Sequence, residues 1–186
     1  MLNTRRITKL SHSIIERQIN AEGVHVWPFD RTFPLDVRLL VIDKHAVRMN
    51  RHDYFELLYA HCGEATFKVQ GRDVVIRKGD LFVIGSTLFH GRVHRERTRL
   101  KAVVLYFLPE LIYRAGNIDE EAVEYLMPFL SQNGSFPHLV PAHTGLPKRV
   151  LHWIQAIQKE LPAASPQARL CVKTYLRMIL VMLAKH

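Results

Sequence analysis

The chain has 186 residues, of which 48% are hydrophobic, so it is long enough for one folded domain with a small appendage and too apolar for general disorder. Its 26 Lys and Arg residues exceed its 17 Asp and Glu residues, which gives a formal net charge of +9. This surplus suits work near nucleic acid or an anionic ligand, although a solvated basic surface explains it equally well.

Residues 1–20 are polar and rich in Arg and Lys, which excludes a signal peptide and indicates an N-terminal arm without a strong core pattern. The most apolar run of the chain, residues 178–184, is far shorter than the roughly 20 residues that a bilayer requires, so we expect no membrane partner. Cys62 and Cys171 are too few for a disulfide framework, and we therefore expect a cytoplasmic protein.

Short strands dominate the prediction for residues 21–110. Apolar and β-branched runs predict strands at residues 37–42, 55–59, 66–70, 73–77, 81–84 and 100–107. Gly71 and Arg72 form a predicted two-residue turn of type II′ between two of them. Strands this short, joined by tight turns, indicate a β-sandwich or a barrel.

Helices dominate the prediction for residues 111–186, with a loop at residues 131–147. Residues 148–161 form an amphipathic pattern that Pro162 ends. The last helix, at about residues 166–185, is apolar most of the way round, so it must be buried from more than one direction.

A partner chain is one way to bury that last helix. We expect a dimer interface made by Leu176, Ile179, Leu180 and Leu183, because apolar patches of this size are rare on the surfaces of monomers. The alternative is that the helix packs between its own neighbours in the chain. The chain stops at His186 directly after this helix, which we interpret as a boundary inside a longer protein.

Two polar clusters interrupt the β-rich region. The first contains Asn50, His52 and Glu56, and the second contains His90, Arg92 and His94. Side chains alternate between the two faces of a strand, so one strand can present each cluster on a single face. If both strands line one barrel, the clusters meet inside it and form a pocket.

A metal ion is one candidate ligand of this pocket. His52, Glu56 and His90 supply two imidazoles and one carboxylate, a set that suits iron, manganese, nickel or zinc, and His94 or Asn50 can complete it. The alternative needs no metal, because His52 and Glu56 can hydrogen-bond each other or buried backbone groups.

A small organic molecule is the other candidate ligand, since apolar walls with a few polar groups form the usual small-molecule site. Arg92 would then favour a carboxylate, a phosphate or sugar hydroxyls. The alternative places Arg92 on the surface, in a basic run with Arg95, Arg97 and Arg99.

The two clusters lie in motifs that resemble those of the cupins. The motifs are Asn50-x-His52-x3-Glu56-x6-Gly63 and Gly79-Asp80-x4-Gly85-x-Thr87-x2-His90. The stretches RHDYFELLY, GRDVVIRKGDLFVIGSTLFH and VVLYFLPELI resemble the N-terminal sensor domain of AraC/XylS-type transcriptional regulators. The resemblance covers about residues 27–111, and the later helices match the linker and dimerisation region of that family.

The resemblance implies a mainly β fold with C-terminal helices: a cupin-like, double-sheet jelly-roll barrel at residues 21–110 and a helical dimerisation region at residues 111–186. It implies a homodimer that binds DNA only through a C-terminal helix-turn-helix domain, which these residues do not contain. It also implies a small effector inside the barrel, without cofactor or catalysis, and the implied ligand-binding residues are His52, Glu56, His90, Asn50, Arg92, Ala102 and Val104.

The sequence departs from the cupin pattern at three positions. Cupin metal sites usually have two histidines in the first motif, whereas Asn50 stands at the first of these positions. Gly85 replaces the usual proline and Thr87 the second glycine. These departures favour the sensor over its rival, a small metal-dependent cupin enzyme such as a dioxygenase or isomerase that uses Fe, Mn, Ni or Zn. A third possibility is a dimerisation module with a collapsed barrel that binds no ligand.

Overall fold

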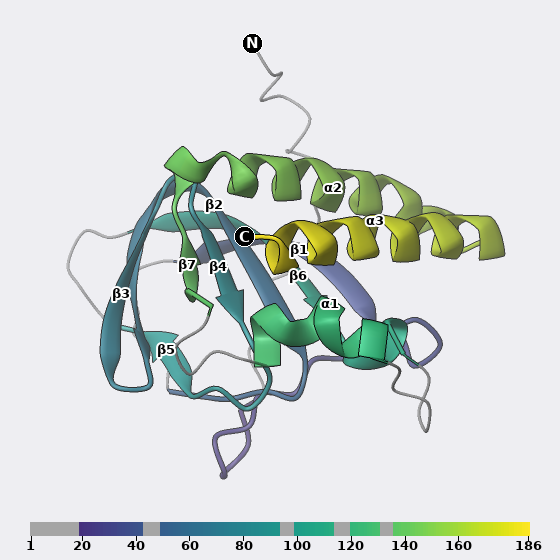
Figure 1. The fold of residues 1–186 in the computed structure, drawn as a ribbon. Coiled ribbons are helices and arrows are strands. Elements are labelled where there is room, and N and C mark those ends of the chain that lie inside the picture. The colour runs from purple at the N-terminus through teal and green to yellow at the C-terminus, as the bar shows by residue number, and fades with distance from the viewer. Residues whose placement is uncertain (1–18, 43–48, 94–98, 114–119, 131–135) are drawn as a thin grey trace.

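The structure is a computed structural model of the chain, and it describes residues 19–42, 49–93, 99–113, 120–130 and 136–186. The predicted N-terminal arm, up to residue 18, and His94 lie outside these residues. Figure 1 shows strands curved into a half-open shell, with helices packed across one face. The prediction of a mainly β fold with C-terminal helices is confirmed.

The strands follow the chain in this order: β1 (Leu35–Ile42), β2 (Phe55–Val69), β3 (Arg72–Arg77), β4 (Leu81–Ile84), β5 (His90–Arg92), β6 (Leu100–Phe107) and β7 (Leu139–Val140). The α-helices are α1 (Glu120–Leu130), α2 (Leu146–Glu160) and α3 (Pro166–Ala184). Short 3₁₀ turns are η2 (Pro109–Leu111), η3 (Ala142–Thr144) and η4 (Leu161–Ala163).

The long strand β2 belongs to two sheets. Its first half pairs with β4 and β6 in a sheet with the order β1-β6-β2-β4-β7, and its second half pairs with β3 and β5. The register of β2 against β6 shifts between Ala60 and Cys62, and such a bulge bends the strand from one sheet into the other. All pairs are antiparallel, and the strand path does not close, so the expected barrel is open.

Alternate residues of the larger sheet face two separate cores. In β6, Val103 and Leu105 belong to the core beneath the helices, whereas Ala102 and Val104 belong to the core between the two sheets. This alternation follows from the period of two in a strand, and it gives the molecule an interior that the helices do not fill.

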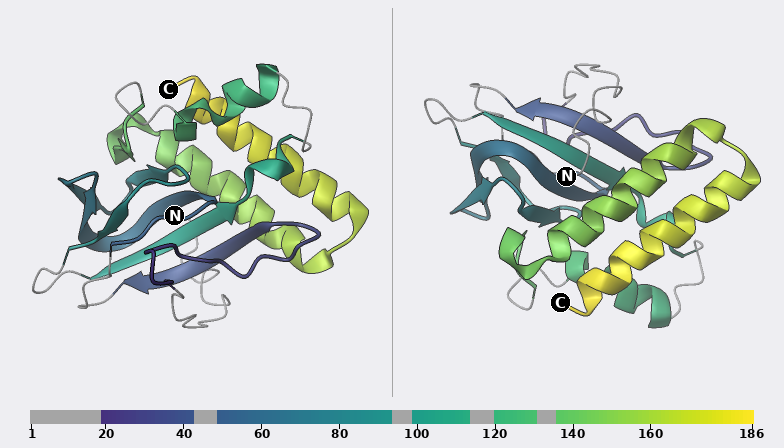
Figure 2. Two further views of the ribbon diagram at one scale, coloured as in Figure 1. Left: turned by 90° about the horizontal axis from the view of Figure 1, so that it is seen from below. Right: turned by 90° about the horizontal axis from the view of Figure 1, so that it is seen from above.

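Helices α2 and α3 form an antiparallel hairpin across the outer face of the larger sheet (Figure 2). The hydroxyl of Ser165 accepts a hydrogen bond from the amide of Ala168 at 3.1 Å and caps the start of α3. Among the residues that the structure describes, no helix is long and apolar enough to cross a membrane.

The predicted dimer residues lie inside the chain's own core. Leu176, Ile179, Leu180 and Leu183 are completely buried, because α2 and α1 both pack against α3 and the sheet lies beneath it. This corrects the prediction that these four side chains contact a partner chain, and the helix packs between its own neighbours instead. The large apolar side chains of α3 that are exposed are Leu170 and Met178.

Candidate functional site

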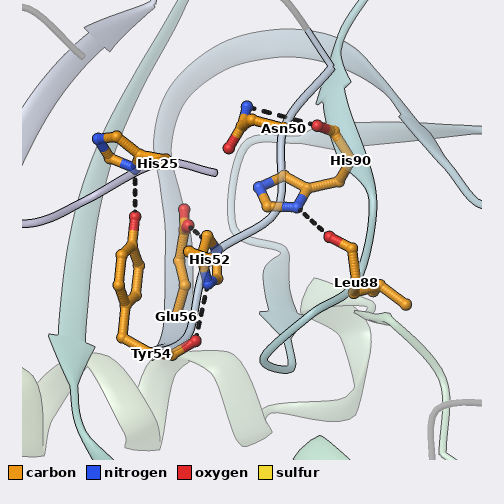
Figure 3. Close-up of polar contacts among 7 residues, drawn as sticks. All are labelled: His25, Asn50, His52, Tyr54, Glu56, Leu88 and His90. Carbon is orange, nitrogen blue, oxygen red and sulfur yellow. Dashed lines mark hydrogen bonds and ion pairs between the residues drawn. The ribbon is translucent and has the colours of Figure 1, made fainter. Parts of the chain in front are cut away.

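The five polar residues predicted for the pocket, among those described, come together between the two sheets. Asn50, His52, Glu56, His90 and Arg92 are all buried, with no more than 4% of any residue exposed. Figure 3 shows four of them, with the imidazole rings of His52 and His90 beside the carboxylate of Glu56. The pattern of polar residues in the sequence therefore predicted a set of side chains that lie in the same interior of the structure.

The backbone brings them together differently from the prediction. Only Glu56 lies in β2, while His52 precedes the strand and the chain bends at Asp53 and Tyr54. Asn50 forms an isolated bridge with His90, in which each backbone amide donates to the other carbonyl at 2.9 Å. The prediction that one strand presents the whole first cluster is therefore wrong, and a bend followed by a bridge does this instead.

The imidazole of His52 is held in one tautomer. Its Nδ1 lies 2.7 Å from the carbonyl oxygen of Tyr54, and because a carbonyl can only accept, Nδ1 carries the hydrogen. In the neutral ring Nε2 then presents a lone pair, and it lies 3.3 Å from Oε2 of Glu56. The two atoms are within ion-pair distance, yet Nε2 makes no aligned hydrogen bond although it is fully buried.

The imidazole of His90 is held in the same way. Its Nδ1 lies 2.9 Å from the carbonyl oxygen of Leu88, so this nitrogen also donates and Nε2 is the lone-pair nitrogen of the neutral ring. The rings of His52 and His90 are 5.0 Å apart between centroids, at 74°. One nitrogen of each ring and a carboxylate oxygen of Glu56 all lie within 4.8 Å of one another.

Two residues of the site were missed in the sequence. The ring of Tyr54 stacks on that of His52, with centroids 3.8 Å apart and 7° between the planes, and its hydroxyl is hydrogen-bonded to Nδ1 of His25 (Figure 3). The period of two that selects His52 and Glu56 also selects Tyr54, so its position carried a signal. His25 lies far away in the sequence and carried none.

The remaining predicted residues line the same interior. Arg92 is 3% exposed and lies opposite Phe67 across the β2–β5 pair, so the alternative of a surface arginine is wrong. Ala102 and Val104 are fully buried on the inward face of β6. Ala102 lies opposite Ala60 of β2. Both side chains are small, so they take up little of the interior at this point.

These residues fit a divalent metal ion. Two imidazole nitrogens and a carboxylate form a donor set that first-row transition metals accept. Metal-binding histidines usually donate their second ring N–H to a backbone carbonyl or a carboxylate, and His52 and His90 both donate to carbonyls here. The buried lone pair on Nε2 of His52, which has no hydrogen-bond donor, is the atom that such an ion would satisfy.

A cavity of about 100 Å³ opens elsewhere, between the loop before β1 and the turn that joins α2 to α3. Its walls include Phe33, Leu161 and Val172, with Asp30 and Arg169 among the charged residues that line it. Buried polar side chains do not converge there as they do between the sheets. We therefore place the functional site in the interior around His52.

Comparisons with known proteins identify the family and the fold of the chain. The family model of the AraC-like ligand binding domain matches residues 41–170. The structure of the AraC-like transcriptional activator CuxR is similar over 84% of this chain and 54% of that chain, with 13% sequence identity and a TM-score of 0.56. At this identity the similarity shows the fold alone. No protein with a curated description matches the sequence.

Two more distant structures are cupins or enzymes by description. A predicted oxalate decarboxylase from Thermotoga maritima is 26% identical over 39% of this chain and 64% of its own, with a TM-score of 0.35. A cupin protein from Bacteroides fragilis is 12% identical over 46% of this chain and 70% of its own, with a TM-score of 0.37. The chain spans 52–64% of the length of the first three solved structures that it matches.

Proposed function

This chain belongs to the family of AraC-like ligand binding domains, and from that premise we propose that it is the effector-sensing domain of a transcriptional regulator. The observation that carries the proposal is the convergence of five buried polar side chains inside an otherwise apolar interior. Burying polar groups costs free energy unless they find partners, and a binding site is where a protein has reason to gather them.

The effector is a small molecule with an anionic or hydroxyl-rich end. The guanidinium of Arg92 favours a carboxylate, a phosphate or sugar hydroxyls, and Glu56 can accept hydrogen bonds from hydroxyls. Ala102 and Val104 supply apolar contact on the inward face of β6, where Ala60 leaves room. Asn50 holds the backbone of His90 and so fixes the position of that imidazole.

Effector binding is coupled to the segment that follows the N-terminal arm. His25 donates its backbone amide to the carbonyl of Arg51 at 2.8 Å, and Arg51 donates to the carbonyl of Gly23 at 2.9 Å. This pairing places residues 23–25 against the chain just before His52. An effector that moves His52 would therefore change how the arm packs, and deletion of residues 1–20 with an unchanged effector response would contradict this coupling.

In the whole protein we place this domain in a cytoplasmic homodimer that binds DNA through a helix-turn-helix domain outside these 186 residues. The support is the family membership and the match to slightly more than half of an AraC-like activator. The dimer would use a surface other than the buried face of α3, because the chain's own core occupies that face.

Thermal denaturation in the presence of candidate effectors tests the proposal. The panel contains sugars, aromatic carboxylic acids and fatty acids, and we expect one class to raise the melting temperature, because a ligand at 100 times its Kd stabilises the native state by about 2.7 kcal/mol. Ala102→Leu, which fills the interior, should abolish the rise, whereas Lys101→Leu on the exposed face of the same strand should keep it. No rise with any class, or a rise that Ala102→Leu retains, would contradict the proposal.

The second candidate function is a metal-dependent cupin enzyme, a dioxygenase or an isomerase. It is favoured by the ligand atoms of His52, Glu56 and His90, which lie within 4.8 Å of one another. Oxygen uptake by protein loaded with Fe²⁺ in the presence of aromatic diols, lost in His52→Ala, would support a dioxygenase. Metal binding without turnover would instead leave the sensor as the function.

A further inference from the structure

We propose that the cavity between the loop before β1 and the turn that joins α2 to α3 is a second binding site, which takes a small organic ammonium ion. This site is separate from the interior around His52, and it goes beyond the proposed sensing function because it gives the domain a ligand of another class. The apolar body of the ligand lies in the cavity, and its ammonium group faces the carboxylates at the mouth.

Two segments that are distant in the sequence build the floor of the cavity. Phe33 and Leu35 come from the loop before β1 and from its first residue, while Ala168 and Val172 lie one helical turn apart on α3. Figure 2 shows in both views that this loop lies beside the turn between α2 and α3. All four side chains are buried, with at most 8% of any residue exposed, so the floor is apolar.

The volume of the cavity, about 100 Å³, limits the size of the ligand. An apolar cavity of about 150 Å³ holds benzene, so this one accepts an apolar body of about four carbon atoms. The small side chain of Ala168 leaves this room on the α3 side, and Ala164 is an exposed residue at the mouth. The ligand can therefore enter from solvent and keep its polar end at the surface.

Asp30 and Arg169 lie at the mouth and offset each other's charge. The guanidinium of Arg169 donates to Oγ1 of Thr32 at 3.1 Å, and this hydroxyl donates to the carboxylate of Asp30 at 2.8 Å. The pKa of Asp30 lies below its ordinary value of 3.8, mainly because the amide of Thr32 donates to it, and the same hydroxyl and the charge of Arg169 add to this effect. The carboxylate is therefore ionised at neutral pH, and the two residues together contribute no net charge.

Glu160 gives the mouth a negative net charge. It is the last residue of α2, it is half-buried, and it forms no ion pair with any residue that the structure describes. The C-terminal end of a helix carries partial negative charge, which adds to that of the carboxylate. The mouth therefore favours a ligand whose polar end is a cation.

The start of α3 lies at the same turn, and in general the N-terminus of a helix attracts anions. Here the backbone donors of the first turn are already used or missing. Pro166 has no N–H, the amide of Ala168 donates to the hydroxyl of Ser165 at 3.1 Å, and the amide of Arg169 donates to the carbonyl of Ser165 at 2.9 Å. An anion therefore gains little at this helix, and the negative charge of the mouth decides the class of ligand.

Titration of the ¹⁵N-labelled protein at pH 7, followed by amide chemical shifts, tests the site. The probes are butylamine, butan-1-ol and pentanoate, which share a four-carbon chain and end in an ammonium, a hydroxyl and a carboxylate group. We expect butylamine to shift the amides of Phe33, Ala164 and Arg169 with a Kd on the order of 1 mM, as suits a ligand of five non-hydrogen atoms. The alcohol and the carboxylate should bind about fivefold more weakly or not at all, because they lack the charge that Glu160 attracts.

Two pairs of variants assign the binding to this cavity. Ala168→Leu fills the floor and should abolish the shifts caused by butylamine, whereas Ala184→Leu, at the exposed end of the same helix, should keep them. Glu160→Gln should weaken the binding of butylamine about fivefold, whereas Glu124→Gln, on the exposed side of α1, should bind as the wild type does. The dispersion of the amide spectrum confirms that each variant is folded.

Three results would overturn the proposal. Butylamine that causes no shifts, or shifts only around His52 and Glu56, would show that this cavity is not its site. Equal affinity for the three probes, or an unchanged affinity in Glu160→Gln, would show that the mouth does not select a cation. Binding that a folded Ala168→Leu variant retains would show that the apolar body does not lie in the cavity.

Discussion

The carboxylate of Asp80 joins the turn before β4 to η3, the 3₁₀ turn that precedes α2, because its Oδ1 accepts a hydrogen bond from the amide of Ala142 at 2.9 Å. The other oxygen, Oδ2, accepts from the amide of Arg77, also at 2.9 Å. These two amides belong to segments that are distant in the sequence. One side chain therefore fixes the position of the segment before α2 relative to the turn before β4.

Asp80→Asn should lower the free energy of unfolding by about 2–4 kcal/mol, because hydrogen bonds to a charged group contribute about 1.5–3 kcal/mol each and the new amide group faces one backbone N–H. Asp73→Asn is the control, since it removes an exposed ion pair with Lys68 whose contribution is at most about 1 kcal/mol. Urea denaturation at pH 7 measures both. Equal losses in the two variants would contradict the role of Asp80.

Gly63→Ala should destabilise the fold more than Gly71→Ala. Both glycines have positive φ, +84° and +81°. The left-handed backbone therefore destabilises the folded state by about 1–2 kcal/mol in either alanine variant. A Cβ on Gly63 would also lie 1.8 Å from the carbonyl oxygen of Arg99, whereas a Cβ on Gly71 meets nothing within 4 Å. The difference between the two unfolding free energies isolates the clash, and a difference near zero would argue against this close approach of β2 and β6.

The strands were predictable from the sequence to the extent that their apolar pattern is unbroken. Residues 55–59 and 66–70 were predicted as two strands, but both lie in β2, because the exposed stretch between them continues the strand without an apolar pattern. The two-residue strand β7 lies in the predicted loop, where it pairs with β4. Both differences come from strand pairing between distant residues, which local pattern does not encode.

The residues of the site were predictable, but the backbone that positions them was not. His52 is not in a strand, and a bend at Asp53 and Tyr54 places its imidazole beside the carboxylate of Glu56. The covering of α3 was not predictable, because an apolar helix must be buried but its pattern does not say by what. Whether a partner chain or the helices α1 and α2 cover Leu180 depends on tertiary packing alone.

Leu180→Ala should cost about 2–5 kcal/mol, because it opens a cavity in the core beneath the helices, whereas Met178→Ala on the 42%-exposed side should cost less than about 1 kcal/mol. A residue in an intrachain core loses the same free energy at every protein concentration, whereas a loss at an obligate dimer interface depends on concentration. Chemical denaturation at two protein concentrations, a hundredfold apart, measures this. If the loss of unfolding free energy in Leu180→Ala depends on protein concentration, this residue lies in a dimer interface and the assignment to the chain's own core is wrong.

Stability should decrease below neutral pH in part because of His138. Desolvation by burial is the main cause that lowers the pKa of this imidazole below its ordinary value of 6.5, and an interaction with the backbone carbonyl of Val83 opposes it. The unfolded chain therefore binds a proton at a higher pH than the folded chain does. The stability that the neutral ring contributes is complete well above pH 6.5, and it is lost as the pH falls through the unfolded pKa toward the lower, folded one.

His138→Gln removes this titration, so the variant should lose less stability than the wild type between pH 7.5 and pH 5. The other imidazoles titrate in both proteins, and comparison of the two pH profiles therefore isolates His138. His152→Gln, at an exposed position on α2, should follow the wild-type profile. Urea denaturation across this pH range measures all three proteins. A wild-type profile that coincides with that of His138→Gln would show that burial does not disfavour the charged ring at this position.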